Sequence, residues 1–108
     1  MKDPLQPTRC ARLLAALASP ERLRIVRFLR EGPRNVTEVA EMLGTTAVNA
    51  SHHLTVLRHA KLVRSQRQGR FMLYSLPPSV FSPGEDVSGE REHINLGCCR
   101  IEIPRTEG

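Results

Sequence analysis

Two groups of side chains in this sequence of 108 residues could do chemistry: polar and basic residues in its middle, and three cysteines near its two ends. The middle group combines amides, hydroxyls, imidazoles and guanidiniums, which hydrogen-bond to the edges of DNA bases and to phosphates. One apolar member can also meet a thymine methyl group. The candidate DNA-binding residues are Thr46, Val48, Asn49, Ser51, His52, Thr55, Arg58, Lys61, Arg64, Arg67, Gln68 and Arg70.

Positive charge is concentrated in the same part of the sequence. Residues 42–84 contain five basic residues and no aspartate or glutamate, so this segment alone has a charge equal to the chain's net charge of +5. A surface of this kind favours a polyanion as its partner, although basic residues also occur on ordinary solvated faces. With three Phe, one Tyr and no Trp, the chain has few rings on which single-stranded bases could stack. We therefore expect double-stranded DNA as the partner.

The cysteines are Cys10, Cys98 and Cys99. Three thiolates suit soft metal ions, and by the same softness they suit trivalent arsenic, which takes three ligands. Oxidation of the thiols is a second use, and packing of Cys10 and Cys99 as small apolar side chains is a third. The sequence leaves three interpretations open: a thiophilic metal or metalloid site, a redox sensor, or no sensing role.

Nothing in the sequence suggests export or membrane insertion. No apolar stretch approaches the roughly 18 residues of a membrane span, and residues 1–8 lack the apolar core of a signal peptide. We expect a cytoplasmic protein without a membrane partner, whose cysteines are reduced thiols and not a disulfide framework.

A helix is expected to present the middle group. In residues 45–60, apolar side chains and one histidine recur at steps of three and four, which is typical of one packed helix face. They are Ala50, His53, Leu54, Leu57 and Ala60. A shorter stripe predicts a helix over residues 36–43, with Gly44 at the turn and Thr45 or Thr46 as the cap of the second helix. The pattern is that of a helix-turn-helix, whose second helix enters the major groove.

Two more helices are expected before this motif. Residues 1–7 should form a flexible arm, and Thr8 should cap a helix over residues 9–18. Its apolar stripe, part of which a second copy of the chain could cover, consists of Cys10, Leu13, Leu14 and Leu17. Ser19-Pro20 is typical of a helix start and Gly32-Pro33 of a helix end. The helix between them should bury Leu23, Ile25, Val26, Phe28 and Leu29.

A hairpin should follow the reading helix. Residues 62–65 and 71–76 are rich in strand formers, and Gln68-Gly69 can make the turn between them. The basic tip suits a wing laid along phosphates or into a minor groove, with an ordinary exposed turn as the alternative.

Residues 77–108 form a tail rich in proline and glycine, which we expect to serve dimerisation or sensing. The tail has room for at most a short helix over residues 85–95. Residues 98–104 alternate between apolar and polar side chains, which predicts an edge strand or a strand that crosses a dimer interface.

The segments ASPERLRIVRFLREG, VTEVAEMLG and ASHHLTVLRHAKLVRSQRQGRFMLYSL together resemble the arsenic-repressor (ArsR/SmtB) family of bacterial winged-helix repressors over residues 9–76. The most specific piece is SHHLTVLRHAKLV followed by GRFMLYSL. The resemblance implies a homodimer, joined through the first helix and the C-terminal segment, that leaves a partly palindromic operator when an inducer binds. It also implies a reading helix over residues 46–59 and a wing over residues 64–76.

The chain departs from that family at its usual metal sites. One family site places a C-x-C pair in the short helix before the turn, where this chain has NVTEVAEML without a cysteine. A second family site uses an Asp, two His and a Glu on a long C-terminal helix, where this chain offers Glu90, Glu92 and His93. Neither site can be carried over, so the metal-ligand candidates remain Cys10, Cys98 and Cys99.

The sequence therefore predicts a mainly α protein with a small β-hairpin, forming a dimeric winged helix-turn-helix over residues 8–76. Its expected function is sequence-specific DNA binding as a transcriptional repressor, released by a thiophilic ion such as As(III), with no required cofactor. The alternatives are a thiol-redox-responsive repressor and a winged-helix protein-interaction module without DNA binding. We do not expect an enzyme, because the sequence lacks the G-x-S-x-G, P-loop, H-E-x-x-H and C-x-x-C motifs.

Overall fold

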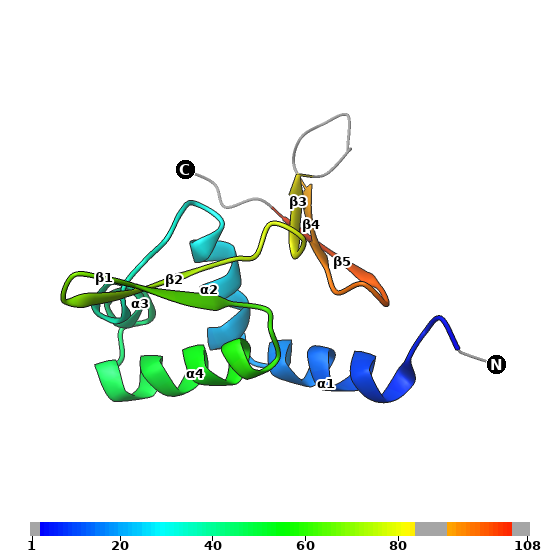
Figure 1. The fold of residues 1–108 in the computed structure, drawn as a ribbon, viewed down its shortest axis with the longest axis horizontal. Helices are drawn as coiled ribbons and strands as arrows, with labels where there is room; N and C mark the ends of the chain where they lie inside the picture. The colour runs from blue at the N-terminus through cyan, green and yellow to red at the C-terminus, as the bar shows by residue number, and fades with distance from the viewer. Residues whose placement is uncertain (1–2, 84–90, 105–108) are drawn as a thin grey trace.

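The computed structural model describes residues 3–83 and 91–104, in which four helices precede two small antiparallel sheets (Figure 1). The helices are α1 (Pro7–Leu17), α2 (Pro20–Leu29), α3 (Val36–Leu43) and α4 (Ala47–His59). The first sheet pairs β1 (Arg64–Gln68) with β2 (Phe71–Ser75). The second has the order β3 (Phe81–Pro83), β4 (Arg91–Asn95), β5 (Arg100–Pro104). This arrangement confirms the predicted mainly α fold with a hairpin, and it adds a sheet that the sequence did not predict.

The core lies between α2, α3 and α4. Ile25 and Val26 of α2, Val39 of α3, and Leu54 and Leu57 of α4 are completely buried. These residues recur at helical steps, so each helix turns one apolar side inward. Leu13 and Leu17 of α1, and Ile94 and Leu96 of the second sheet, extend the same core toward the C-terminal part of the chain.

Local chemistry explains where three of the helices begin. The Ser19 hydroxyl accepts a hydrogen bond from the Arg22 N–H, and the Thr46 hydroxyl accepts one from the Asn49 N–H. Asn35 and Glu38 form a reciprocal capping box at the start of α3. Each bond satisfies a backbone donor that the first helical turn leaves without a partner. The predicted caps at Ser19 and Thr46 are thus confirmed.

The N-terminal helix differs from the prediction. It begins at Pro7, with Gln6 as the capping residue, so Thr8 lies inside the helix and does not cap it. The described part of the predicted arm forms a turn, in which the Gln6 N–H donates to the Asp3 carbonyl. The buried side of α1 contains Ala16 beside Leu13 and Leu17, and Leu14, on the other flank of the helix, is 42% exposed.

Another predicted core residue is on the surface. Leu23 of α2 is 40% exposed, whereas Ile25, Val26 and Leu29 are buried as expected. Phe28 is partly buried against the core, and the Arg34 guanidinium lies over its ring at 4.7 Å. The buried side of α2 is therefore narrower than its apolar composition suggests.

The β1–β2 hairpin is fixed to the helical domain at its base. Arg34 and Tyr74 exchange two backbone hydrogen bonds, which join β2 to the loop before α3. The hairpin pairs Gln68 with Phe71, so its turn consists of Gly69 and Arg70, one residue later than predicted. Gly69 has φ +60°, a left-handed conformation that glycine adopts without strain.

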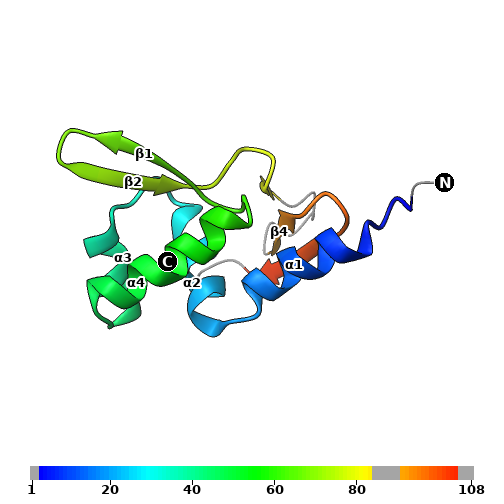
Figure 2. The same cartoon turned by 60° about the horizontal axis from the view of Figure 1, so that its bottom comes forward.

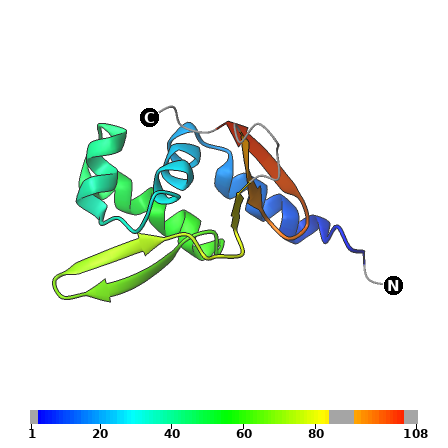
Figure 3. The ribbon, with the colours of Figure 1, turned by 90° about the horizontal axis from the view of Figure 1, so that it is seen from above.

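The second sheet lies beside α1, at the end of the molecule opposite to the hairpin (Figures 2 and 3). Its strand β4 occupies Arg91–Asn95, where a short helix had been allowed; the rest of that predicted helix lies outside the described residues. Glu92 is buried in this strand and forms an ion pair with Arg30, the C-cap residue of α2, which offsets the cost of burying the carboxylate. The predicted edge strand is confirmed as β5, with alternating half-buried and exposed residues.

None of the helices in the described part of the chain has both the length and the apolar character needed to cross a membrane.

The packing of α4 makes a testable prediction for stability. Leu54→Ala should lower the free energy of unfolding by about 2–5 kcal/mol, because it removes a completely buried side chain and leaves a cavity. Val48→Ala in the same helix should change it by less than about 0.5 kcal/mol, because that side chain is 82% exposed. Urea unfolding followed by circular dichroism measures both. Equal effects of the two substitutions would contradict this orientation of α4.

Candidate nucleic-acid interface and thiol cluster

Helix α4 packs with one side and presents the other to solvent. Ala50, Leu54 and Leu57 are completely buried. On the opposite side, Val48 is 82% exposed, and Asn49 and His52 are also exposed. The face predicted to contact bases is therefore free of the core.

The first turn of α4 holds Asn49 in place. The Asn49 side-chain amide donates to the Thr45 hydroxyl at 3.0 Å, and its backbone N–H donates to the Thr46 hydroxyl at 3.1 Å. A carboxamide held at the N-terminus of a reading helix is suited to hydrogen-bond an adenine edge. Thr46 itself is exposed, although its hydroxyl already accepts the capping bond.

Two of the predicted contact residues are less available. Ser51 and Thr55 are half-buried, and the Thr55 hydroxyl donates to the Ser51 carbonyl at 2.9 Å. The single hydroxyl hydrogen of Thr55 is thus engaged inside the helix, and only its oxygen lone pairs remain to accept a bond.

The basic residues predicted to hold phosphates all lie on the surface. They extend from the end of α4 to the turn of the hairpin, and the structure gives none of them an ion pair with a described acidic residue. These exposed residues are Arg58, Lys61, Arg64, Arg67 and Arg70, together with the neutral Gln68. Cationic side chains that are not engaged in ion pairs are suited to contact a phosphate backbone.

Lys61 shows an unusual backbone conformation. Its φ is 62°, in the left-handed region where a residue with a side chain is uncommon, and its N–H donates to the Arg58 carbonyl at 2.9 Å. Lys61 follows Ala60, the C-cap residue of α4, and directs the chain toward the hairpin. Sequence reasoning missed this role, which glycine usually fills.

The N-terminal end of α4 and the tip of the hairpin lie at the same end of the molecule, away from α1 and the second sheet (Figures 1 and 3). The reading helix and the basic wing can therefore approach one ligand together.

His53 lies on the inner side of α4, as predicted. Its Nδ1 is 3.2 Å from the Arg22 guanidinium and accepts a hydrogen bond when the imidazole is neutral. Burial lowers the pKa of His53 below the ordinary 6.5, and the positive charge of Arg22 lowers this pKa further; Glu21 acts in the opposite direction. His52 is exposed beside it, and its ring is tilted by 56° relative to the His53 ring.

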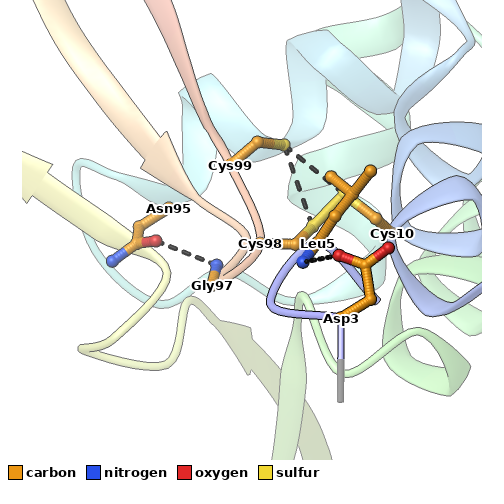
Figure 4. Close-up of a disulfide and its surroundings, with 7 residues drawn as sticks. All are labelled: Asp3, Leu5, Cys10, Asn95, Gly97, Cys98 and Cys99. Carbon is orange, nitrogen blue, oxygen red and sulfur yellow. Dashed lines mark hydrogen bonds between the residues drawn. A yellow bond between two sulfur atoms is a disulfide. The ribbon is translucent and has the colours of Figure 1, made fainter. Parts of the chain in front are cut away.

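The three cysteines meet, although 88 residues separate two of them. Cys10 of α1 forms a disulfide with Cys98 in the turn between β4 and β5, and Cys99 next to it is a free thiol (Figure 4). The Cys99 sulfur lies 3.7 Å from the Cys10 sulfur and 3.9 Å from the Cys98 sulfur. The expectation that all three are reduced is therefore wrong for Cys10 and Cys98. The fold places their Cα atoms 6.0 Å apart, which is ordinary for a disulfide.

The geometry of this thiol cluster (Cys10, Cys98 and Cys99) fits a soft three-coordinate ion once the disulfide is reduced. The three sulfur atoms lie within 4.8 Å of one another, Cys10 is buried and the other two are half-buried. The ligand candidates considered earlier on the tail do not converge: Glu92 pairs with Arg30, His93 lies 3.5 Å from Glu102, and Glu90 is outside the described residues.

Comparison with known proteins agrees with this geometry. The sequence profile described as a helix-turn-helix domain matches residues 17–66. The HTH-type transcriptional regulator NmtR of Mycobacterium tuberculosis is 42% identical over 88 residues, which are 81% of this chain and 73% of that protein. A "Probable mercury resistance operon repressor" of Streptomyces lividans is 34% identical over 70 residues, 65% of this chain and 56% of that protein.

A solved structure has the same fold. The homodimeric winged helix-turn-helix DNA-binding domain of a possible ArsR-family transcriptional regulator from Mycobacterium bovis aligns with a TM-score of 0.62. It is 33% identical, and the alignment covers 64% of each chain.

The environment of His53 predicts a pH-dependent stability. The folded state favours the neutral imidazole of His53, so this histidine should contribute fully to the free energy of unfolding above pH 6.5, the ordinary pKa that it has in the unfolded chain. The contribution should be lost as the pH falls from that value through the lower pKa of the folded state. Urea unfolding at about pH 7.5 and about pH 5.5 measures the loss. His53→Gln should reduce it, whereas His59→Gln should not, because His59 is exposed on the same helix and is not among the groups that shift the pKa of His53. An unchanged loss in His53→Gln would assign the pH dependence to another group.

Proposed function

This chain belongs to the arsenic-repressor (ArsR/SmtB) family of winged helix-turn-helix transcriptional regulators, and on that premise we propose that it represses transcription as a homodimer bound to a palindromic operator. The observation that carries the proposal is the exposed polar face of α4 beside a basic surface without acidic residues between positions 42 and 84. DNA binding, not catalysis, is thus its activity, and its site of action is the cytoplasm, where bacterial DNA lies.

In the proposed complex, α4 enters the major groove with its N-terminal turn foremost. Asn49 reads an adenine, Val48 meets a thymine methyl group, and His52 contacts a base or a nearby phosphate. The two copies of α4 in a dimer then occupy successive major grooves, about 34 to 36 Å apart.

The hairpin is the wing of this complex. Arg64, Arg67 and Arg70 hold phosphates on either side of the groove, and Arg58 and Lys61 do the same at the end of α4. Such contacts bind every sequence similarly, so specificity comes from α4 and affinity from the wing and its surroundings.

The division of roles can be measured. Arg67→Ala should weaken binding to operator and random duplex alike and reduce the slope of log affinity against log salt by about 1 for each protomer. Asn49→Ala should instead cost about 1–3 kcal/mol on the operator and relax the preference at one base pair. Fluorescence anisotropy titrations against the gene's own upstream DNA, at several salt concentrations, give both values.

Arg12→Ala is the matched control, because Arg12 is an exposed arginine of α1, at the opposite end of the molecule. Sedimentation equilibrium checks that this variant still dimerises, since α1 is expected to take part in the dimer contact. An unchanged salt slope for Arg67→Ala would remove the wing from the complex. Failure of the wild-type chain to bind duplex DNA at low salt would favour the protein-interaction module instead.

A second function, inducer sensing at the thiol cluster, is supported by the convergence of the three sulfur atoms. In the reduced protein, arsenous acid would exchange its three hydroxyl groups for three cysteine sulfurs and release three water molecules, without any change of oxidation state. The similarity to a mercury resistance repressor supports a thiophilic inducer. The alternative, a thiol-redox switch, uses the same residues, because formation of the Cys10–Cys98 bond removes two of the three ligands.

The two kinds of sensing can be separated with one variant. The protein is reduced with a phosphine, the phosphine is removed, and operator binding is titrated with arsenite or with peroxide. Under metalloid sensing, arsenite lowers the DNA affinity of wild type by about tenfold or more. Cys99→Ser abolishes this response but leaves the Cys10–Cys98 pair able to oxidise. A response to peroxide alone, kept by Cys99→Ser and lost by Cys98→Ser, identifies a redox switch, and no response to either agent excludes both.

A further inference from the structure

The outer edge of the second sheet is a strand whose backbone groups face away from its neighbour. The Leu96 N–H donates to the Cys99 carbonyl at 2.9 Å, so this pair is hydrogen-bonded, and along an antiparallel ladder every second pair repeats that pattern. Ile101 and Ile103 therefore bond to β4, whereas the N–H and C=O groups of Arg100 and Glu102 point outward. Within the described residues, no strand pairs with this edge of β5.

We propose that two copies of the chain dock along β5, edge to edge and antiparallel, so that the three strands of each copy form one continuous sheet. The proposal rests on the homodimer of the proposed function and specifies the contact that its C-terminal segment makes. Exposed edges of this kind pair readily with another strand, and natural proteins cover or protect them.

Charge selects the register of this pairing. The hydrogen-bonded pairs across the interface must join outward-facing residues, which leaves three symmetric choices near the middle of β5. Centring on Arg100 places arginine opposite arginine, and centring on Glu102 places glutamate opposite glutamate. Centring on Ile101 places each Arg100 opposite the other copy's Glu102, twice by symmetry. The Glu102 carboxylate, which lies 3.5 Å from His93 of its own chain, has further lone pairs with which to accept from this arginine. Pro104 has no N–H to donate, so registers that extend past it lose a bond.

The same register also brings the apolar sides of the two β5 strands next to each other. Ile101 and Ile103 are half-buried against the core, whereas Arg100, Glu102 and Pro104 are exposed. In the register centred on Ile101, each Ile101 faces its own copy across the symmetry axis, and each Ile103 lies opposite Cys99 of the other copy. The core of one chain thus continues into the other.

A hollow at the end of β5 supports an occupant at this position. It lies between α2 and β5, and its lining includes the exposed Leu23 together with Ile103 and Pro104. In the proposed register the turn of the other copy, which contains Gly97 and Cys98, comes beside this hollow and can cover it. The thiol cluster consequently adjoins the dimer contact, so a ligand at Cys99 alters the pairing of the two chains.

The test uses charge reversal in the full-length chain. Arg100→Glu alone places glutamates opposite glutamates, and Glu102→Arg alone places arginines opposite arginines; each should raise the dissociation constant of the homodimer by at least about tenfold. An equimolar mixture of the two variants restores both opposite-charge pairs, so it should form heterodimers with nearly the wild-type dissociation constant. Sedimentation equilibrium over a range of concentrations measures these constants, and circular dichroism checks that each variant is folded.

Glu41→Arg is the matched control for Glu102→Arg, because it makes the same change at an exposed position of α3, far from β5, and it should leave dimerisation unchanged. The double variant Arg100→Glu with Glu102→Arg restores the pairs within one chain, so it tests the register even if one single variant does not fold. Single variants that dimerise like wild type, or a mixture that associates no better than its components, would overturn the edge-to-edge register while leaving the homodimer intact. A wild-type chain that remains monomeric and does not bind duplex DNA would instead refute the proposed function.

Discussion

Burial of one side of α4 is the constraint on which the rest of the structure depends. Leu54 and Leu57 are completely buried against the other helices, so α4 cannot rotate about its axis without exposing them to water. That constraint turns Val48, Asn49 and His52 outward. The capping hydrogen bond to the Thr46 hydroxyl then fixes the residue at which the helix begins, and with it the position of Asn49 in the first turn. The reading face is therefore a consequence of packing on the opposite face.

The wing is attached to the same rigid body. Two backbone hydrogen bonds between Arg34 and Tyr74 join β2 to the loop before α3, and the capping box of Asn35 and Glu38 begins α3 immediately afterwards. A duplex held by the wing is thus held relative to the helix-turn-helix. The absence of acidic residues from 42 to 84 means that the basic side chains of this surface have no carboxylate of their own segment to neutralise them.

The parts predicted well from sequence depend on local interactions, and the others depend on partners distant in the chain. The bounds of α3 and the caps at Ser19 and Thr46 follow from residues within one helical turn. The capping box at Asn35 had a readable signal, N-x-x-E, which the prediction did not use. The exposure of Leu14 and Leu23, by contrast, depends on which elements cover α1 and α2. No local pattern could show that Cys10 and Cys98, which are 88 positions apart, would form a disulfide. The presence of three soft thiolate ligands in the sequence had nevertheless suggested that the cysteines could bind one ion together.

The proposed sensing site and the proposed DNA-reading face lie at opposite ends of the molecule, and this separation limits how a signal could pass from one to the other. The thiol cluster joins α1 to the turn between β4 and β5, whereas the reading helix begins at the opposite end (Figure 1). A ligand at the cluster would touch no residue of the reading face, because the hydrophobic core lies between them. Protein interiors transmit rigid-body movement better than local distortion. Two reading helices must fit grooves one turn of duplex apart, so in the proposed dimer a small rotation of one protomer against the other at β5 would destroy that fit. In the proposed dimer, sensing beside the β5 contact would therefore act on the distance between the two reading helices and leave each helix intact.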